Sequence, residues 1–136
     1  MRKVIIAAAL FGALVSGPAR STTYICDVKG AYEINKGEVV PSQTKYSDLR
    51  TWPKVVFDDV SGQFKYGKDD RWTEEKMLVT SKGSKHSSAT GYYMHNGTIF
   101  TAIAVYSWRN PIEFQWLGGG LSDLLTGTCK HYGNLE

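Results

Sequence analysis

The stretch Ser21–Gly30, STTYICDVKG, contains one of the two cysteines of the chain, and Leu125–Gly133, LTGTCKHYG, contains the other. Cys26 and Cys129 therefore lie near opposite ends of the segment that follows the apolar start of the sequence. The residues around Cys26 are rich in β-branched and aromatic side chains, which favour strands. A disulfide between the two cysteines would join the first strand to the last. Disulfides persist only in oxidising compartments, so the compartment in which the chain folds decides much of its architecture.

The start of the chain has the layout of a secretory signal peptide. Arg2 and Lys3 precede an uninterrupted apolar run, Val4–Val15, and small residues and a proline follow it. The run is shorter than the roughly 20 residues that a membrane span needs, so a permanent anchor is not expected. We predict a cleaved signal peptide at residues 1–19, with Ser21 as the other cleavage position, and an exported bacterial protein, periplasmic or secreted. A buried first helix of a cytosolic protein is the alternative.

An exported protein folds where disulfides persist, and this chain has an even number of cysteines with no Cys-x-x-Cys spacing. We therefore predict a Cys26–Cys129 disulfide, with two free thiols as the alternative. In the chain-entropy model, closing a loop of about 100 residues stabilises a protein by roughly 4–5 kcal/mol. That is a large share of the stability of a small domain.

Charge and length restrict the classes of function. Without residues 1–19 the chain keeps 14 basic and 13 acidic side chains, because only Arg2 and Lys3 are removed. Such a balance does not indicate the clustered Lys and Arg of a nucleic-acid-binding face. Residues 20–136 are long enough for a single domain with a modest core, and we expect a monomer.

Short strand signals separated by turns recur after residue 22. We predict an all-β fold, an antiparallel barrel or sandwich of about seven or eight short strands. A disulfide between the first and last strands favours a closing barrel over an open sheet. One helical turn is expected near Ser47–Arg50. The segments with strand signals are Thr23–Val28, Ala31–Ile34, Lys54–Asp59, Gln63–Tyr66, Glu75–Ser81, Ala89–His95, Thr98–Trp108, Ile112–Trp116 and Leu124–Cys129.

The clearest local unit is a hairpin around Asn96-Gly97, a dipeptide that favours positive φ at both central turn positions. The strand that follows it, Thr98–Trp108, is largely apolar on both faces. A strand in the middle of a barrel, or one that faces a partner, has this pattern. In Ile112–Trp116 the alternation predicts that Ile112, Phe114 and Trp116 point inward.

Three short motifs resemble a loose set of small exported bacterial proteins of unknown function. They are Tyr24-Ile25-Cys26, the strand end Phe57–Gly62, and Gly127-Thr128-Cys129. This resemblance implies export and fold, not activity. A weaker resemblance, carried by Ser87–Gly97 (SSATGYYMHNG), is to the periplasmic C-type lysozyme inhibitors, which are small β-barrels that insert a loop into an enzyme. The inserted loop of those inhibitors has a Ser-Gly-x-x-Tyr pattern, whereas in this chain Ala89 and Thr90 separate Ser88 from Gly91.

The side chains that usually perform catalysis are not arranged as known motifs. His86, His95 and His131 have no zinc-site spacing, and we expect them to be solvated. The pairs Asp58-Asp59, Asp69-Asp70 and Glu74-Glu75 are adjacent in sequence, so on a strand each pair would point to opposite faces. Asp58 and Asp59 are expected to form a turn, and the acidic run 69–75 a solvated turn with Trp72 packed inward. No metal, cofactor or catalytic residue is assigned.

The aromatic residues late in the chain are the most informative feature. Tyr92, Tyr93, Tyr106, Trp108 and Trp116 are the candidate binding surface, because Tyr and Trp suit interfaces that are partly apolar and partly wet. The alternative is that all of them belong to the core. We therefore expect a non-enzymatic binding protein, with inhibition of a cell-wall-active enzyme as one form of it. A lipocalin-like carrier of a small apolar ligand is the alternative, and an enzyme of unrecognised mechanism is the third hypothesis.

Overall fold

The computed structural model describes residues 20–42, 53–69, 71–133 and 135. The predicted signal peptide and the helical turn expected near Ser47–Arg50 lie outside these residues. The described residues form strands and turns without a helix, as predicted, and none of them forms a helix that could span a membrane. The strands are β1 (Thr23–Asn35), β2 (Glu38–Pro41), β3 (Lys54–Asp58), β4 (Gln63–Lys68), β5 (Arg71–Lys76), β6 (Leu78–Ser81), β7 (Ala89–His95), β8 (Thr98–Tyr106), β9 (Ile112–Gly118) and β10 (Asp123–Tyr132).

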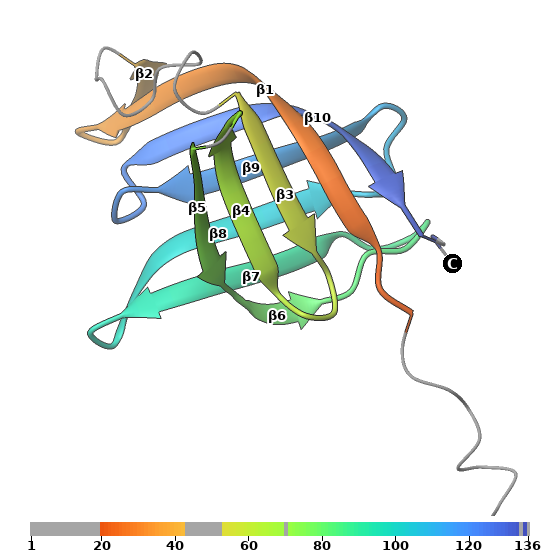
Figure 1. The fold of residues 1–136 in the computed structure, drawn as a ribbon. Helices are drawn as coiled ribbons and strands as arrows, with labels where there is room; N and C mark the ends of the chain where they lie inside the picture. The colour runs from red at the N-terminus through yellow and green to blue at the C-terminus, as the bar shows by residue number, and fades with distance from the viewer. Residues whose placement is uncertain (1–19, 43–52, 70, 134, 136) are drawn as a thin grey trace, which may run out of the picture.

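The strands form one antiparallel sheet in the order β5-β4-β3-β1-β10-β9-β8-β7-β6, with β2 paired to the second half of β1. The two outermost strands of this order, β5 and β6, follow each other in the chain and are separated only by Met77. The sheet therefore curls into a nearly closed barrel, which Figure 1 shows. This agrees with the predicted fold class.

The predicted strand list needs three corrections. Thr23–Val28 and Ala31–Ile34 are one strand, β1, with a bulge between Val28 and Gly30. β2 was not predicted, and the segment Glu75–Ser81 is divided at Met77 between β5 and β6. The count is therefore ten strands among the described residues. A bulge interrupts the alternation of side chains, so a single strand with a bulge resembles two strands in the sequence.

The acidic run around residues 69–75 is another correction, because most of it is strand β5 and not a turn. Trp72 is 37 % exposed, although we expected it to pack inward. β5 is an edge strand that pairs with β4. Charged side chains on an edge protect it from pairing with other chains, and they also remove the alternating pattern by which a strand is recognised.

The hairpin turns follow the expected local chemistry. Asn96 and Gly97 have φ values of 50° and 75°, and they connect β7 to β8. Lys36 and Gly37 have φ values of 51° and 80°, and they connect β1 to β2 in the same way. Positive φ at both central residues matches the twist of the flanking strands, so both turns favour hairpins.

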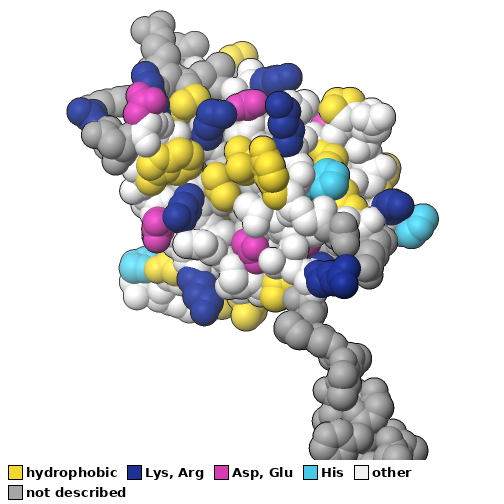
Figure 2. All heavy atoms as spheres, turned by 45° about the vertical axis from the view of Figure 1, so that its right-hand side comes forward, with side chains coloured by type: hydrophobic (Ala, Val, Ile, Leu, Met, Phe, Trp, Pro, Cys, Tyr) yellow, Lys and Arg dark blue, Asp and Glu magenta, His cyan; other side chains and the backbone are white. Residues whose placement is uncertain are grey.

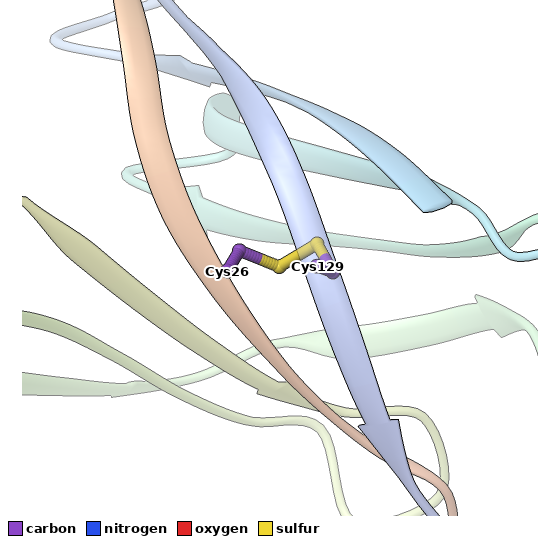
Figure 3. Close-up of a disulfide and its surroundings, with 2 residues drawn as sticks. All are labelled: Cys26 and Cys129. Carbon is purple, nitrogen blue, oxygen red and sulfur yellow. A yellow bond between two sulfur atoms is a disulfide. The ribbon is translucent and has the colours of Figure 1, made fainter. Parts of the chain in front are cut away.

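The disulfide joins Cys26 of β1 to Cys129 of β10, as predicted. These residues lie directly opposite each other in the antiparallel pairing of the two strands (Figure 3). β1 is the first strand of the chain and β10 is the last. The bond therefore closes the chain across the central pair of the sheet.

The barrel interior is filled by large apolar side chains. Tyr24, Phe57, Phe64 and Phe114 are fully or almost fully buried. Trp116 is 4 % exposed, and its ring centroid lies 5.2 Å from that of Phe64 and 4.7 Å from that of Tyr66. Close aromatic packing of this kind contributes strongly to core stability. The alternation predicted for β9 is thus confirmed for Phe114 and Trp116.

Candidate binding surface

Three side chains at the end of β8 and in the turn after it form a compact cluster on the outside of the barrel. The guanidinium carbon of Arg109 lies 4.2 Å from the ring centroid of Tyr106 and 4.8 Å from the ring centroid of Trp108. The two rings lie edge to face, with centroids 6.3 Å apart. Trp108 is nevertheless 49 % exposed. We call Tyr106, Trp108 and Arg109 the Tyr–Arg–Trp cluster.

Hydrogen bonds hold each member of the cluster in place. The Tyr106 hydroxyl donates to Gln115 Oε1 at 3.1 Å, and Trp108 Nε1 donates to Ser88 Oγ at 3.0 Å. Arg109 donates to Glu113 Oε2 at 3.0 Å, in an exposed ion pair with i,i+4 spacing. Exposed pairs of this kind add little to stability. In this cluster the ion pair fixes the orientation of side chains that are also in contact with water.

The cluster depends on a loop that the core holds in place. Ser107 is buried, and its hydroxyl oxygen lies 2.7 Å from the carbonyl oxygens of both Ser84 and Ser87. These contacts attach the loop that precedes β7 to the end of β8. Ser88, which accepts the Trp108 hydrogen bond, follows directly in that loop. The position of Trp108 is thus coupled to the barrel interior.

A buried aspartate fixes the other side of the same loop. Asp59 is 1 % exposed, and it accepts hydrogen bonds from the backbone N–H groups of Thr22 at 2.8 Å and Gly83 at 3.0 Å. The Tyr24 hydroxyl donates to it at 3.4 Å. A Cβ atom on Gly83 would lie 2.1 Å from the Tyr24 hydroxyl, so only glycine allows this close approach.

Burial sets the protonation behaviour of this network. Burial raises the pKa of Asp59, and the backbone donors Thr22 and Gly83 oppose that change. Burial also raises the pKa of Tyr24, and the negative charge of Asp59 adds to the effect. The three hydrogen bonds to Asp59 connect it to two segments that are distant in sequence. We therefore interpret it as a structural carboxylate, a role that its predicted place in a turn did not suggest.

The neighbouring carboxylate, Asp58, also has a structural role. Asp58 caps the turn after β3, where it accepts from the backbone N–H groups of Val60 and Ser61. Burial alone would raise its pKa, but these hydrogen bonds and those from hydroxyl groups lower it. Glu75 lies half-buried on the edge strand β5, where burial raises its pKa and the Thr101 hydroxyl opposes the change. An inward-pointing charge is one way to protect an edge strand.

The five predicted surface residues do not lie together. Tyr106 and Trp108 belong to the Tyr–Arg–Trp cluster, and Tyr92 lies on the outer side of β7 opposite Ala102 of β8. Tyr93 packs against the core. Trp116 is a core residue, which corrects its assignment to the surface. Its residue type indicated an interface, but its place in the alternation of β9 put it inside.

Sequence reasoning missed Arg109, a member of the cluster, and the two residues of β9 that contact its members, Glu113 and Gln115. Arg109-Asn110-Pro111 follows the predicted strand Thr98–Trp108 and indicates only a turn. The i,i+4 spacing of Arg109 and Glu113 gave no usable signal, because that spacing has meaning for helices. Gln115 lies two residues after Glu113, on the same face of β9, which the alternation does predict.

The three histidines do not suggest a metal site or a second cluster. His86, His95 and His131 are exposed, as expected. The described residues contain no group of three or more side chains that could hold a metal ion. Figure 2 shows one face, on which hydrophobic side chains lie in separate patches among Lys and Arg side chains. Scattered exposed apolar residues are usual for a soluble surface.

Comparison of the chain with protein-family models, with curated proteins and with solved structures finds no match. The function must therefore be argued from the residues themselves.

Proposed function

We propose that this chain is an exported, non-enzymatic binding protein that contacts a macromolecular partner through the Tyr–Arg–Trp cluster. The observation that carries the proposal is the half-exposed Trp108 beside an Arg109 that contacts two aromatic rings. Trp, Tyr and Arg are the residues most enriched among those that dominate binding energy at protein interfaces.

The rigidity of the cluster supports the same proposal. Side chains that are ordered only on binding cost about 0.5–1.5 kcal/mol each. The contacts of Tyr106, Trp108 and Arg109 with Gln115, Ser88 and Glu113 reduce that cost before a partner arrives. The disulfide is compatible with an oxidising compartment outside the cytosol, where such a partner would be met.

Two tryptophan variants test the proposed surface. Trp108→Ala should weaken partner binding by at least about 30-fold, since a dominant interface residue contributes about 2 kcal/mol or more. Trp72→Ala is the matched control, because Trp72 is also exposed and its ring nitrogen also has a partner, the Asp69 carbonyl oxygen at 2.6 Å. The control should bind like the parent protein.

The finer proposal is inhibition of a cell-wall-active enzyme. A panel of lysozymes and other wall hydrolases, assayed for inhibition by the mature protein and by both tryptophan variants, tests it directly. Proteins captured from cell-envelope extracts, identified and then measured as purified pairs, cover partners that are not enzymes. Equal binding by Trp108→Ala and Trp72→Ala, or no partner in either experiment, would contradict the proposed surface.

Export is tested by the mass of the protein recovered from the cell envelope or medium. Cleavage after Ala19 or after Ser21 gives distinct masses, and the disulfide removes two hydrogens from either one. A cytosolic protein that retains residues 1–19 would contradict this part of the proposal. The native mass also tests the carrier alternative, because a bound small molecule would increase it. The described interior is filled by side chains such as Phe64 and Trp116, so no observation favours that alternative.

A further inference from the structure

The barrel has a seam at which its sheet is not closed. Among the described residues β5 pairs only with β4 and β6 pairs only with β7, so no ladder of hydrogen bonds joins β5 to β6. Met77, which separates the two strands, is 3 % exposed, and its backbone N–H donates to the carbonyl oxygen of Gly62 at 2.7 Å. One end of β5 is thus fixed at Met77, while its outer edge has no partner strand. We call the break between β5 and β6 the seam.

Only one residue of β5 is withdrawn from solvent, and it is acidic. Five of the six residues of the strand are exposed, and Glu75 is the exception. In the ladder between β4 and β5, Glu75 lies opposite Phe64, which is fully buried inside the barrel. Residues that are paired across a ladder share a face, so Glu75 also points inward. A strand that covers a core normally packs apolar side chains inward. The inward contact of β5 is made instead by a group that can carry a charge.

The groups around this carboxylate are neutral. Glu75 Oε2 and Thr101 Oγ1 of β8 are both buried, and neither has a hydrogen-bond partner of good geometry in the part of the chain that the structure describes. Burial favours the neutral form of Glu75 and raises its pKa, and the Thr101 hydroxyl opposes that change. Two phenols lie on the same side. Tyr66 of β4 has a pKa raised by burial and by the charge of Glu75, and Tyr93 of β7 lies opposite Thr101.

No cation compensates the charge of Glu75 from within the described residues. Neither Lys, Arg nor His is among the groups that change its pKa. Lys65 of β4 pairs with Glu74 at 3.0 Å, on the outer side of the two strands. A buried carboxylate without a paired cation is costly when it is charged and much less so when it is neutral. Water can solvate the charged form of Glu75 if β5 moves away from the interior.

We propose that the seam is a pH-sensitive gate, in which protonated Glu75 keeps β5 against the barrel interior and loss of its proton lets β5 move outward from Met77. The closed state binds this proton more tightly than the open state, in which water solvates the carboxylate, so rising pH favours the open state. Opening would expose the inner rings of Phe64, Tyr66 and Trp116 to solvent. The gate does not include the Tyr–Arg–Trp cluster, and it does not depend on the proposed function.

Hydrogen exchange of the backbone amides of β5, followed by NMR from pH 4 to pH 8, tests the gate. Expressing each rate as a protection factor removes the intrinsic effect of pH on exchange and leaves the local opening equilibrium. In the parent protein, protection of β5 should fall by up to about tenfold per pH unit between the pKa of the open state, about 4.3, and the higher pKa of the closed state. The amides of β9 and β10, in the middle of the sheet, should not follow this change. Glu75→Gln should make the protection of β5 independent of pH, because the amide does not titrate.

Glu74→Gln is the matched control, because Glu74 is the neighbouring residue of β5 but pairs with Lys65 on the outer side. It should keep the pH dependence of the parent protein. Thr101→Val is a second test, in which Glu75 is retained. Without the hydroxyl that favours the charged carboxylate, protection of β5 should continue to fall to a higher pH. Circular dichroism checks that each variant is folded. Protection of β5 that does not change with pH in the parent protein, an unchanged pH dependence in Glu75→Gln, or an unchanged upper limit in Thr101→Val would each overturn the gate.

Discussion

Two aromatic clusters of similar composition lie on opposite sides of the same sheet. Phe64, Tyr66 and Trp116 pack together inside the barrel, whereas Tyr106 and Trp108 lie outside it around Arg109. Trp116 is 4 % exposed and Trp108 is 49 % exposed. Residue type is therefore a poor guide to role in this protein. The direction of each side chain from its strand decides whether it stabilises the fold or is available to a partner.

The largest effect should come from emptying the inner cluster. Trp116→Ala should lower the free energy of unfolding by about 3–5 kcal/mol, because it leaves a cavity between Phe64 and Tyr66. Trp108→Ala should change it by less than about 1 kcal/mol. Urea unfolding followed by circular dichroism gives both values. Similar losses for the two variants would remove the distinction between the clusters.

Removal of the disulfide should affect stability but not the outer cluster. The double variant Cys26→Ser with Cys129→Ser should lose about 2–5 kcal/mol of stability. Its folded fraction should retain the Trp108-dependent binding, because the cluster is held by the contacts of Ser107 and Ser88. Thermal unfolding and the partner assay test the two statements separately. Loss of binding in the folded variant would show that the outer surface depends on the covalent closure.

Tyr24 makes the stability of the folded protein depend on pH in the alkaline range. The unfolded tyrosine loses its proton near pH 10, whereas burial and the charge of Asp59 raise the pKa of Tyr24 in the folded protein. Between these two pKa values the folded state binds more protons, so its stability falls as pH rises above about 10. The contribution is up to about 1.4 kcal/mol per pH unit. Tyr24→Phe should remove this part of the slope in unfolding measured from pH 8 to 11, while Tyr132→Phe, at an exposed position, should keep it.

The smallest effect on stability should come from the ion pair of the outer cluster. Glu113→Gln should change the free energy of unfolding by less than about 0.5 kcal/mol, because the pair with Arg109 is exposed. Its effect on partner association should be larger, since Arg109 loses one of the contacts that hold it in place. Equilibrium unfolding and association kinetics give the two values. A large loss of stability would mean that the cluster belongs to the core and not to a binding surface.

Local patterns predicted several features of this fold correctly, and their failures have physical causes. The alternation in Ile112–Trp116 placed Phe114 and Trp116 inside, and it was a better guide than the general preference of tryptophan for interfaces. Trp72 was predicted inward and is exposed because β5 is an edge strand. Asp59 was expected in a turn, yet it is buried and accepts hydrogen bonds from two distant segments, Thr22–Tyr24 and Gly83.

The sequence by itself determined the class of the fold, the Asn96-Gly97 hairpin and the pairing of Cys26 with Cys129. These follow from local conformational preference, from alternation along single strands, and from there being only two cysteines. The tertiary structure alone decided that Arg109 contacts two aromatic rings and that Asp59 fixes the loop behind Trp108. Each of these depends on the register between strands, which a one-residue shift would change completely.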